Sequence, residues 1–203
     1  MTTRQAAYGE HGLTPVDRLG VWLSLRAVRR VVDWSARPDV VDLGCGYEAA
    51  LLRALAPRIG SGVGVDVSVS PRADGVPGLS FVRDRVERAL PALPAASADV
   101  VLAISVLEHL WEPLEALREA HRLLRPGGVL VVNVPTWRGK RALELSAFRL
   151  GLSPAQEMDD HKAYYDLRDL WPLLVRAGFR PSALRVRRHK LGLNLLAVGV
   201  RGG

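Results

Sequence analysis

A glycine-rich turn and two aspartates are the residues of this chain best suited to binding a nucleotide-like cofactor. The stretch Val40-Val41-Asp42-Leu43-Gly44-Cys45-Gly46 runs from an apolar strand directly into two glycines. Glycine permits a tight turn and lets the backbone approach a ligand closely. A second stretch, Gly62-Val63-Gly64-Val65-Asp66, ends in an acid about twenty residues later, where a carboxylate can accept hydrogen bonds from ribose hydroxyls.

The residues after the turn separate two classes of cofactor. A dinucleotide site requires G-x-G-x-x-G, so that a pyrophosphate can lie against the start of the following helix. Here Gly46 is followed by Tyr47, Glu48 and Ala49, so the third glycine is missing. Glu48 would repel a pyrophosphate, whereas a sulfonium-bearing amino acid has no such anion. The turn therefore favours S-adenosylmethionine, and an NAD-dependent oxidoreductase is the less favoured alternative.

Two further stretches carry a resemblance to a known family. They are Asp99-Val100-Val101-Leu102-Ala103-Ile104-Ser105-Val106-Leu107-Glu108-His109-Leu110 and Leu123-Leu124-Arg125-Pro126-Gly127-Gly128-Val129-Leu130-Val131-Val132. With the glycine turn and the ribose acid before them, the chain resembles the class I S-adenosylmethionine-dependent methyltransferases. The likeness is to the broad group that includes quinone-biosynthesis and small-molecule enzymes. Family members often have a small residue where Glu48 stands, and the chain departs from them there.

The resemblance implies S-adenosyl-L-methionine as cofactor and assigns its binding residues. It implies that the methionine part lies at the turn, the ribose at the second acid, the adenine beside the third strand, and the methyl group near the loop after the fourth strand. In that order the predicted cofactor-binding residues are Asp42, Gly44, Cys45, Gly46, Asp66, Val67, Asp84, Arg85, Ser105 and Val106. Cys45 is interpreted as a small side chain that fits the turn, in preference to a nucleophile.

Two histidines are candidates for a catalytic base. Histidine titrates near neutral pH, and a positioned proton transfer contributes about 10²- to 10⁴-fold to a rate. His161 is the preferred base, because related enzymes carry a similar His-x-x-Tyr beside the acceptor pocket, and Tyr164 or Tyr165 would then orient the acceptor. His109, beside Glu108, is the alternative base. Structural roles for both histidines remain open, and no set of metal ligands is predicted.

The acceptor is predicted to be a small molecule that is methylated on a hydroxyl oxygen, with nitrogen or carbon methylation as alternatives. The cluster Arg185-Val186-Arg187-Arg188-His189-Lys190 indicates either attraction of an acidic or phosphorylated acceptor or protection of an edge strand. An RNA methyltransferase and a non-catalytic cofactor-binding protein are less favoured readings. The formal charge of +7 comes mostly from arginines that are scattered along the chain, so the charge does not by itself indicate a nucleic-acid partner.

The elements predicted to position these residues form an α/β fold, a doubly wound and mostly parallel seven-stranded sheet that ends in an antiparallel C-terminal hairpin strand. Strands are expected at 39–43, 62–66, 79–82, 98–104, 128–134, 184–190 and 193–200, and helices at 15–33, 48–57, 112–124 and 166–177. Prolines and glycines in 68–78 disfavour a helix there. Residues 1–36 are expected to form an N-terminal helical lid with Tyr8, His11 and Trp22 as candidates. Residues 37–203 form the methyltransferase domain, with a substrate-recognition insert at 136–163.

Composition sets broad limits on this reading. The 203 residues are 48% hydrophobic and 24% charged, which suits one globular domain. A single cysteine excludes an internal disulfide. The chain has no run of apolar residues long enough for a membrane span and no secretory signal pattern at its start, so a cytoplasmic location is expected. The oligomeric state cannot be read from these features.

Overall fold

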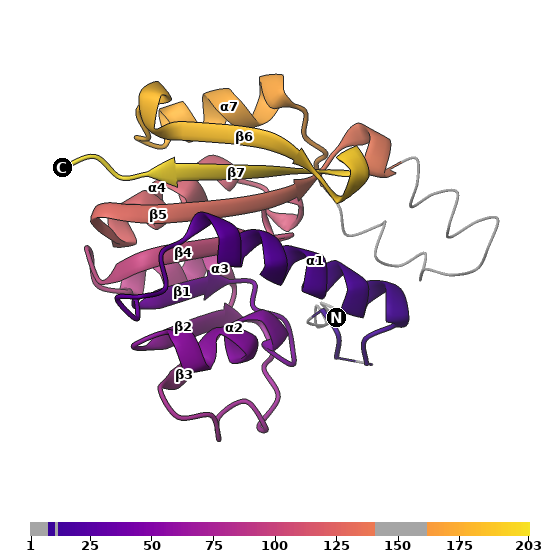
Figure 1. The fold of residues 1–203 in the computed structure, drawn as a ribbon, viewed down its shortest axis with the longest axis vertical. Helices are drawn as coiled ribbons and strands as arrows, with labels where there is room; N and C mark the ends of the chain where they lie inside the picture. Colours follow the sequence, from indigo (N-terminus) through magenta and orange to yellow (C-terminus); the bar gives the residue numbers. More distant parts are fainter. Residues whose placement is uncertain (1–7, 11, 141–161) are drawn as a thin grey trace.

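Seven strands form one sheet in the order β3-β2-β1-β4-β5-β7-β6, seen in Figure 1, a computed structural model that describes residues 8–10, 12–140 and 162–203. The strands are β1 (Val40–Leu43), β2 (Gly62–Asp66), β3 (Leu79–Arg83), β4 (Ala98–Ile104), β5 (Leu124–Pro135), β6 (Leu184–His189) and β7 (Asn194–Val200). The pairs among β1 to β5 are parallel, and β7 runs antiparallel to both of its neighbours. The predicted fold class is confirmed, including the antiparallel hairpin.

Helices cover both faces of the sheet. They are α1 (Pro15–Val31), α2 (Ala50–Leu55), α3 (Val86–Ala89), α4 (Pro113–Leu123) and α7 (Leu167–Arg176), with short 3₁₀ turns η1 (Ala56–Arg58), η2 (Leu90–Ala92), η3 (Leu107–His109), η4 (Pro181–Ala183) and η5 (Lys190–Gly192). Alternate residues of a strand face opposite sides of the sheet. Val100, Leu102 and Val131 accordingly pack in the core beneath α1 and α2. Val101, Leu130 and Val132 pack in the larger core beneath α3, α4 and α7.

The N-terminal helix is well defined but only half covered. Thr14 and Asp17 form a capping box at its start, which satisfies backbone N–H groups that have no partner inside the helix. Ala27 and Val28 in the second half are buried, whereas Leu19 in the first half is 55% exposed. Figure 1 shows the reason, because the first half of α1 extends past the ends of the strands.

Several boundaries differ from the sequence-based expectation, and two of these differences have a local cause. The helix expected to begin at residue 48 begins at Ala50, because Ala49 takes a left-handed conformation with φ 45°. β5 begins at Leu124 instead of residue 128, since the turn through the Pro-Gly-Gly sequence continues the strand, with a register shift opposite Ala98 and Val100. Residues 67–78 contain turns and no helix, as the prolines and glycines predicted.

The β6–β7 hairpin is anchored to the segment that follows β5. The backbone N–H of Thr136 donates to the Leu193 carbonyl at 2.9 Å, and the Thr136 hydroxyl donates to the Gly192 carbonyl at 2.9 Å. A Cβ on Gly139 would lie 2.2 Å from the same Leu193 oxygen, so only glycine permits this approach. The tip of the hairpin is therefore held at the carboxyl edge of the parallel strands.

Candidate active site

The carboxyl ends of β1, β2 and β4 meet at one edge of the sheet, where ligands of open α/β sheets bind. The Gly46 N–H donates to Asp66 Oδ2 at 2.8 Å, and the Gly44 N–H donates to the Val65 carbonyl at 2.8 Å. These bonds join the glycine turn after β1 to the end of β2. The two stretches that the sequence analysis singled out first are therefore adjacent in the fold.

Close packing around Gly44 and Gly46 explains why glycine stands at both positions. Both residues have positive φ angles, 64° and 75°. Residues other than glycine adopt such angles at a cost in conformational free energy. A Cβ on Gly44 would lie 2.8 Å from Cγ2 of Val106 in the loop after β4. A Cβ on Gly46 would lie 3.2 Å from the carbonyl oxygen of Tyr8, which also accepts a hydrogen bond from the Tyr47 N–H at 2.9 Å. The N-terminal segment thus lies against the turn.

The lid candidates have different surroundings. Tyr8 contacts the glycine turn, as described above, and its side chain is 47% exposed. Trp22 on α1 is 52% exposed, so it does not pack against the sheet edge. His11 lies outside the described residues.

Asp42 and Asp66 form a buried acidic pair beneath the turn. Asp42 is 2% exposed and its Oδ2 has no hydrogen-bond partner among the described residues. Burial, followed by the charge of Asp66, raises the pKa of Asp42 to about 8. Burial also raises the pKa of Asp66, although backbone N–H groups, with Gly46 first, oppose the shift. An unpaired buried carboxyl beside a second one suits a ligand that brings a cation and hydroxyl groups, and S-adenosylmethionine has both.

Cys45 has a packing role in the turn. Its Sγ lies 3.7 Å from the Gly46 carbonyl, and a Cβ on Gly64 of β2 would approach the sulfur to 2.9 Å. Burial, then the charges of Asp42 and Asp66, raises the pKa of the thiol. A thiol that is harder to ionise is a poor nucleophile, which agrees with the steric interpretation.

The residues assigned to adenine lie at the ends of β2 and β3. Val67 is partly buried directly after Asp66. Asp84 Oδ1 accepts from the Arg85 N–H at 2.7 Å, and the exposed Arg85 side chain lies 3.8 Å from Glu87. Asp84 is thus engaged with its neighbour's backbone, and its contact with the adenine amine stays a prediction, as does that of Arg85.

The loop after β4 completes the edge. Ser105 is exposed and has a φ angle of 56°, and its N–H donates to the Asn133 carbonyl at 2.8 Å. Val106 is buried against Gly44. A strained non-glycine residue at the end of a strand is typical of positions where the backbone faces a ligand. The contacts of Ser105 and Val106 with the cofactor stay a prediction.

Glu108 is buried, which its place in a loop did not indicate. It is 1% exposed, and its Oε2 has no hydrogen-bond partner among the described residues. Burial raises its pKa to about 8, and the opposing charge of Lys190 lowers it in part. The Glu108 carbonyl accepts from the Lys162 N–H at 2.7 Å, so residue 162 is held beside it. This carboxyl is shielded from solvent, and no arginine among the described residues pairs with it.

The candidate catalytic residues lie at the same edge where they are described. His109 ends η3, and its carbonyl accepts from Lys162 Nζ at 2.8 Å. Tyr164 lies with its ring centroid 5.5 Å from that of Trp137, which follows β5. His161 lies outside the described residues. The structure therefore brings His109 and Tyr164 to the edge where the cofactor is expected.

Two polar residues at this edge were missed by the sequence analysis as site candidates. Asn133 of β5 is fully buried with Nδ2 unpartnered, and its Oδ1 accepts from Asn194 Nδ2 at 2.8 Å. His189 of β6, opposite Asn194, has a buried and unpartnered Nε2, and its pKa is lowered to about 4 by burial and then by Lys190 and Arg187. Asp42 and Glu108 each have one such atom as well. All four unpartnered buried side-chain atoms of the described residues therefore lie at the carboxyl edge. Buried polar groups of this kind require a ligand or water as partner.

The buried acids predict an unusual dependence of stability on pH. Glu108 holds its proton up to about pH 8 in the folded chain, whereas the same carboxyl in the unfolded chain loses it near its ordinary pKa of 4.5. The folded state binds more protons between these values, so the free energy of unfolding falls as pH rises through this window, by at most about 1.4 kcal/mol per pH unit for this group. Glu108→Gln should therefore flatten the fall between pH 5 and pH 8, as measured by urea unfolding. Glu115→Gln, at an exposed side chain, is the matched control, and parallel curves for Glu108→Gln and the unsubstituted chain would contradict the buried acid.

Among the described residues, no three or more histidine, cysteine, aspartate or glutamate side chains are grouped so as to hold a metal ion. Within the same residues, no helix is long and apolar enough to span a bilayer.

Comparisons with known proteins agree with this geometry. The profile of a methyltransferase domain matches residues 22–184. A probable S-adenosylmethionine-dependent methyltransferase of Mycolicibacterium smegmatis is 30% identical over 201 residues, which cover 91% of this chain and 69% of that protein. The ubiquinone biosynthesis O-methyltransferase of Pseudomonas aeruginosa is 33% identical over 106 residues, covering 48% of this chain and 44% of that enzyme.

Solved structures share the fold. A chain of the complex between the Haloferax volcanii methyltransferase activator Trm112 and a methyltransferase superposes with a TM-score of 0.71 at 20% identity, covering 93% of this chain and 92% of that one. A probable S-adenosylmethionine-dependent methyltransferase of Mycobacterium tuberculosis is 29% identical over 192 residues. The chain spans 62% of the length of that relative, which is less than two thirds.

Proposed function

Because this chain belongs to the class I S-adenosylmethionine-dependent methyltransferases, we propose that it transfers the methyl group to a hydroxyl oxygen of a small-molecule acceptor. The observation that carries the proposal is the meeting of a buried acidic pair, a glycine turn and unpartnered polar side chains at one edge of the sheet. Methylation of nitrogen or carbon is the alternative.

The proposed cofactor contacts follow from the positions of the acids. Asp42, with its unpartnered Oδ2, would accept from the ammonium group of the methionine part, and Gly44 and Gly46 would let the backbone approach it. Asp66 would accept from the ribose hydroxyls while holding the Gly46 N–H. Ionisation of Asp42 is favoured once a cation is beside it, because an opposite charge lowers the pKa of a carboxyl.

Methyl transfer needs alignment and a proton acceptor. When bound, the cofactor supplies a methyl group on a positively charged sulfur, and the C–S bond breaks as the new C–O bond forms. Alignment of the reacting groups contributes about 7 to 11 kcal/mol in favourable cases. In the proposal His161 accepts the hydroxyl proton, His109 is the alternative base, and Tyr164 orients the acceptor. The ring contact of Tyr164 with Trp137 supports a fixed orientation for it.

Glu108 is a third candidate for the base. Its carboxyl is buried at the carboxyl edge with Oε2 unpartnered among the described residues, and its pKa of about 8 is close to the range in which a general base is effective. The positive charge of Lys190 acts on it from the β6–β7 hairpin. The Discussion gives the variants that separate Glu108 from the histidines.

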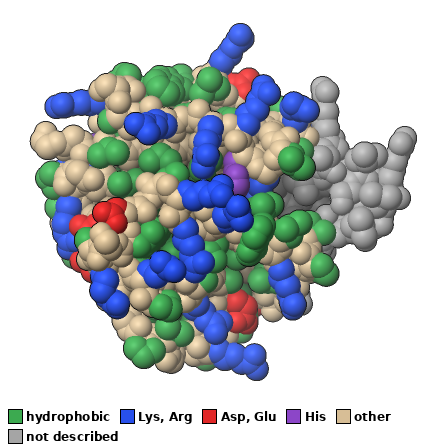
Figure 2. Space-filling view, viewed as in Figure 1, with side chains coloured by type: hydrophobic (Ala, Val, Ile, Leu, Met, Phe, Trp, Pro, Cys, Tyr) green, Lys and Arg blue, Asp and Glu red, His purple; other side chains and the backbone are tan. Residues whose placement is uncertain are grey.

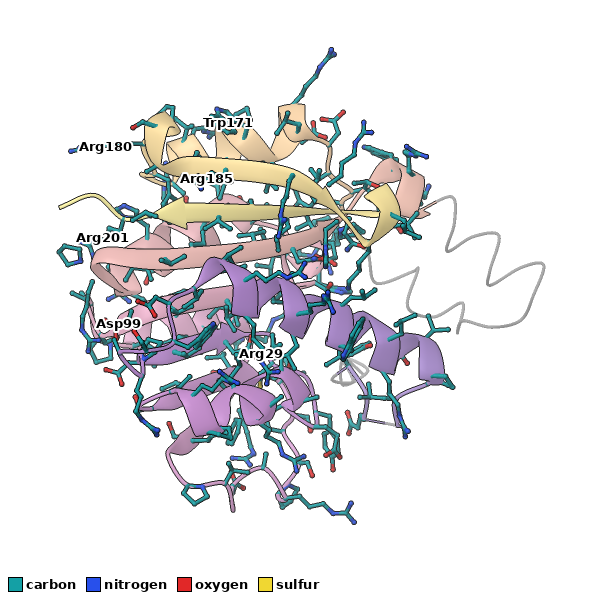
Figure 3. All side chains as sticks on the ribbon, viewed as in Figure 1. Arg29, Asp99, Trp171, Arg180, Arg185 and Arg201 are labelled. Carbon is teal, nitrogen blue, oxygen red and sulfur yellow. The ribbon has the colours of Figure 1, made fainter. Side chains whose placement is uncertain are left out.

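The choice of oxygen and the acceptor's charge have separate support. The name of the Pseudomonas aeruginosa relative specifies O-methylation of a ubiquinone precursor, and the matched region includes about half of this chain. Arg185 and Arg187 are exposed on β6, and Figure 3 labels Arg185 on this strand. Arg185 pairs with Val198, toward the end of β6 away from the carboxyl edge, so Arg187, with Lys190 at the hairpin tip, favours an acceptor that carries a carboxylate or phosphate.

Residues 1–36 and the insert 136–163 are proposed to select the acceptor. The backbone contact between Tyr8 and Tyr47 supports an N-terminal segment that lies over the cofactor turn. Trp137 at the start of the insert is 53% exposed beside Tyr164, which suits the wall of a pocket for an aromatic acceptor.

A methyl-transfer assay tests the reaction. The chain is incubated with S-adenosylmethionine labelled in its methyl group and with hydroxylated aromatic acids, and the products are identified by mass spectrometry. We expect label in a methyl ether. The same acids with their hydroxyl already methylated are the matched controls and should accept no label. Label on nitrogen or carbon in place of oxygen would contradict the proposed acceptor atom.

A further inference from the structure

The edge of the sheet at which the parallel strands end carries a group of exposed apolar side chains, called here the apolar rim. Its members come from α1, from the loop after η3, from the segment after β5 and from the β6–β7 hairpin. Their exposed fractions range from 36% to 98%: Leu19, Trp22, Trp111, Trp137, Leu191 and Leu193. Exposed apolar groups gathered in one region mark interaction surfaces, whereas single ones are ordinary.

Contacts between Trp111 and Trp137 make part of the rim continuous. Lys162 Nζ donates to the His109 carbonyl and lies 5.3 Å from the centroid of the Trp111 ring. Tyr164, two residues later, has its ring centroid 5.5 Å from that of Trp137. Residues 162–164 therefore connect the loop after η3 to the segment after β5.

The hairpin joins this part of the rim to α1. Leu193 accepts from the Thr136 N–H, which places the hairpin beside Trp137. On its other side, Lys190 Nζ lies 3.8 Å from the position that a Cβ on Gly20 of α1 would take. Trp22 is on the same helix. The rim therefore follows the edge at which the active site is proposed.

Each exposed tryptophan of the rim has a cation beside its ring. Arg26 lies 5.6 Å from the Trp22 centroid, Lys140 lies 5.7 Å from the Trp137 centroid, and Lys162 lies over Trp111 as described. Figure 2 shows many Lys and Arg side chains and few acidic ones on the face that includes α1. The chain carries a formal charge of +7. Indole rings prefer the headgroup level of a membrane, and cations beside them attract anionic lipids.

Leu191 at the hairpin tip has no packing role that explains its conformation. Its side chain is 98% exposed, and its φ and ψ angles are 59° and 26°, in the left-handed region where asparagine and glycine fit better. Lys190 before it is also left-handed, with φ 49°. An aliphatic tip favours lipid over nucleic acid, because bases stack on aromatic rings and aliphatic side chains offer neither stacking nor hydrogen bonds.

We propose that the apolar rim docks this protein on a membrane surface that contains anionic lipids. Leu191 enters the acyl region, the exposed tryptophans lie at headgroup level, and Arg26, Lys140 and Lys162 face the lipid phosphates. The mouth of the proposed active site then opens toward the membrane. The docking is independent of the identity of the acceptor.

Vesicle co-sedimentation of the full chain tests the docking. Vesicles of phosphatidylcholine with about a third phosphatidylglycerol, chosen to give a negative surface potential, are compared with vesicles of phosphatidylcholine alone. We expect binding to the anionic vesicles that weakens with added salt. Leu191→Asn should reduce the partition coefficient about tenfold or more, the equivalent of one buried leucine. Because asparagine suits the left-handed conformation, this variant should unfold at the same temperature as the unsubstituted chain or higher.

A matched control and the contrary results complete the design. Val200→Asn changes an aliphatic residue that is 37% exposed at the opposite end of β7, and its binding should remain unchanged. Equal binding of Leu191→Asn and the unsubstituted chain would overturn the proposal, as would no binding to anionic vesicles. Retention by a single-stranded oligonucleotide in preference to the vesicles would assign the surface to nucleic acid and would also overturn it.

Discussion

Replacing His161 by alanine is expected to lower methyl-transfer turnover by about 10²- to 10⁴-fold, the contribution of a positioned general base. The affinity for S-adenosylmethionine should remain nearly unchanged, because the proposed cofactor contacts come from the ends of β1, β2, β3 and β4. Turnover is measured with methyl-labelled cofactor at saturating acceptor, and cofactor affinity is measured by calorimetry. A separate effect on turnover is expected only from a group that acts on the acceptor.

Two further variants identify the base by comparison. His109→Ala removes the alternative histidine, and Glu108→Gln removes the buried carboxyl without changing its size. If Glu108 is the base, its variant should abolish the rise of turnover with pH near the pKa of about 8. Unchanged turnover in His161→Ala would remove His161 from this role and leave the other two candidates to be ranked by the same assay.

Asp66→Ala is expected to weaken the binding of S-adenosylmethionine by about 100-fold or more. Hydrogen bonds to a charged group contribute about 1.5 to 3 kcal/mol each. In the proposal the Asp66 carboxylate accepts from two ribose hydroxyls, and the alanine variant loses both hydrogen bonds. The substitution also removes the acceptor for the Gly46 N–H, which holds the glycine turn against β2 at 2.8 Å. Calorimetric titration with S-adenosylmethionine and with adenosylhomocysteine measures the loss, and both ligands should be affected alike because they share the ribose.

The control for this prediction is an aspartate outside the site. Asp74 pairs with Arg83 at 2.6 Å on the surface, so Asp74→Ala should leave cofactor affinity within about twofold, the small effect typical of an exposed ion pair. Circular dichroism confirms that both variants are folded. Equal cofactor affinity in Asp66→Ala and the unsubstituted chain would exclude the ribose contact.

The cofactor half of the site could be predicted from the sequence because its signals are local. Val40, Val41 and Leu43 are apolar, as expected for a strand covered on both faces, and Gly44 and Gly46 follow directly. Parallel strands place their carboxyl ends at one edge, so the pairing of β1 with β2 was enough to bring Asp66 to the turn. The hairpin at the end of the chain was equally readable, since a short connection requires antiparallel strands.

Element boundaries were less predictable, since they depend on single backbone conformations. The left-handed Ala49 delays the start of α2. The register shift opposite Ala98 lets β5 begin at Leu124. Propensity and periodicity describe average behaviour over several residues, so neither measure could have located these two points.

By itself, the sequence determined the class of fold and the cofactor, and it predicted the turn that would receive the cofactor, because these depend on residues that are neighbours in the chain or at the ends of paired strands. Only the tertiary structure decided that Glu108 and Asn133 are buried, each with one side-chain atom unpartnered among the described residues, and that Trp22 and Leu191 are exposed. Burial depends on which segments pack over a residue. For Glu108 the covering segment includes Lys162, and its effective charge partner, Lys190, comes from a hairpin still further along the chain. Such contacts between distant segments have no signature in the order of the residues.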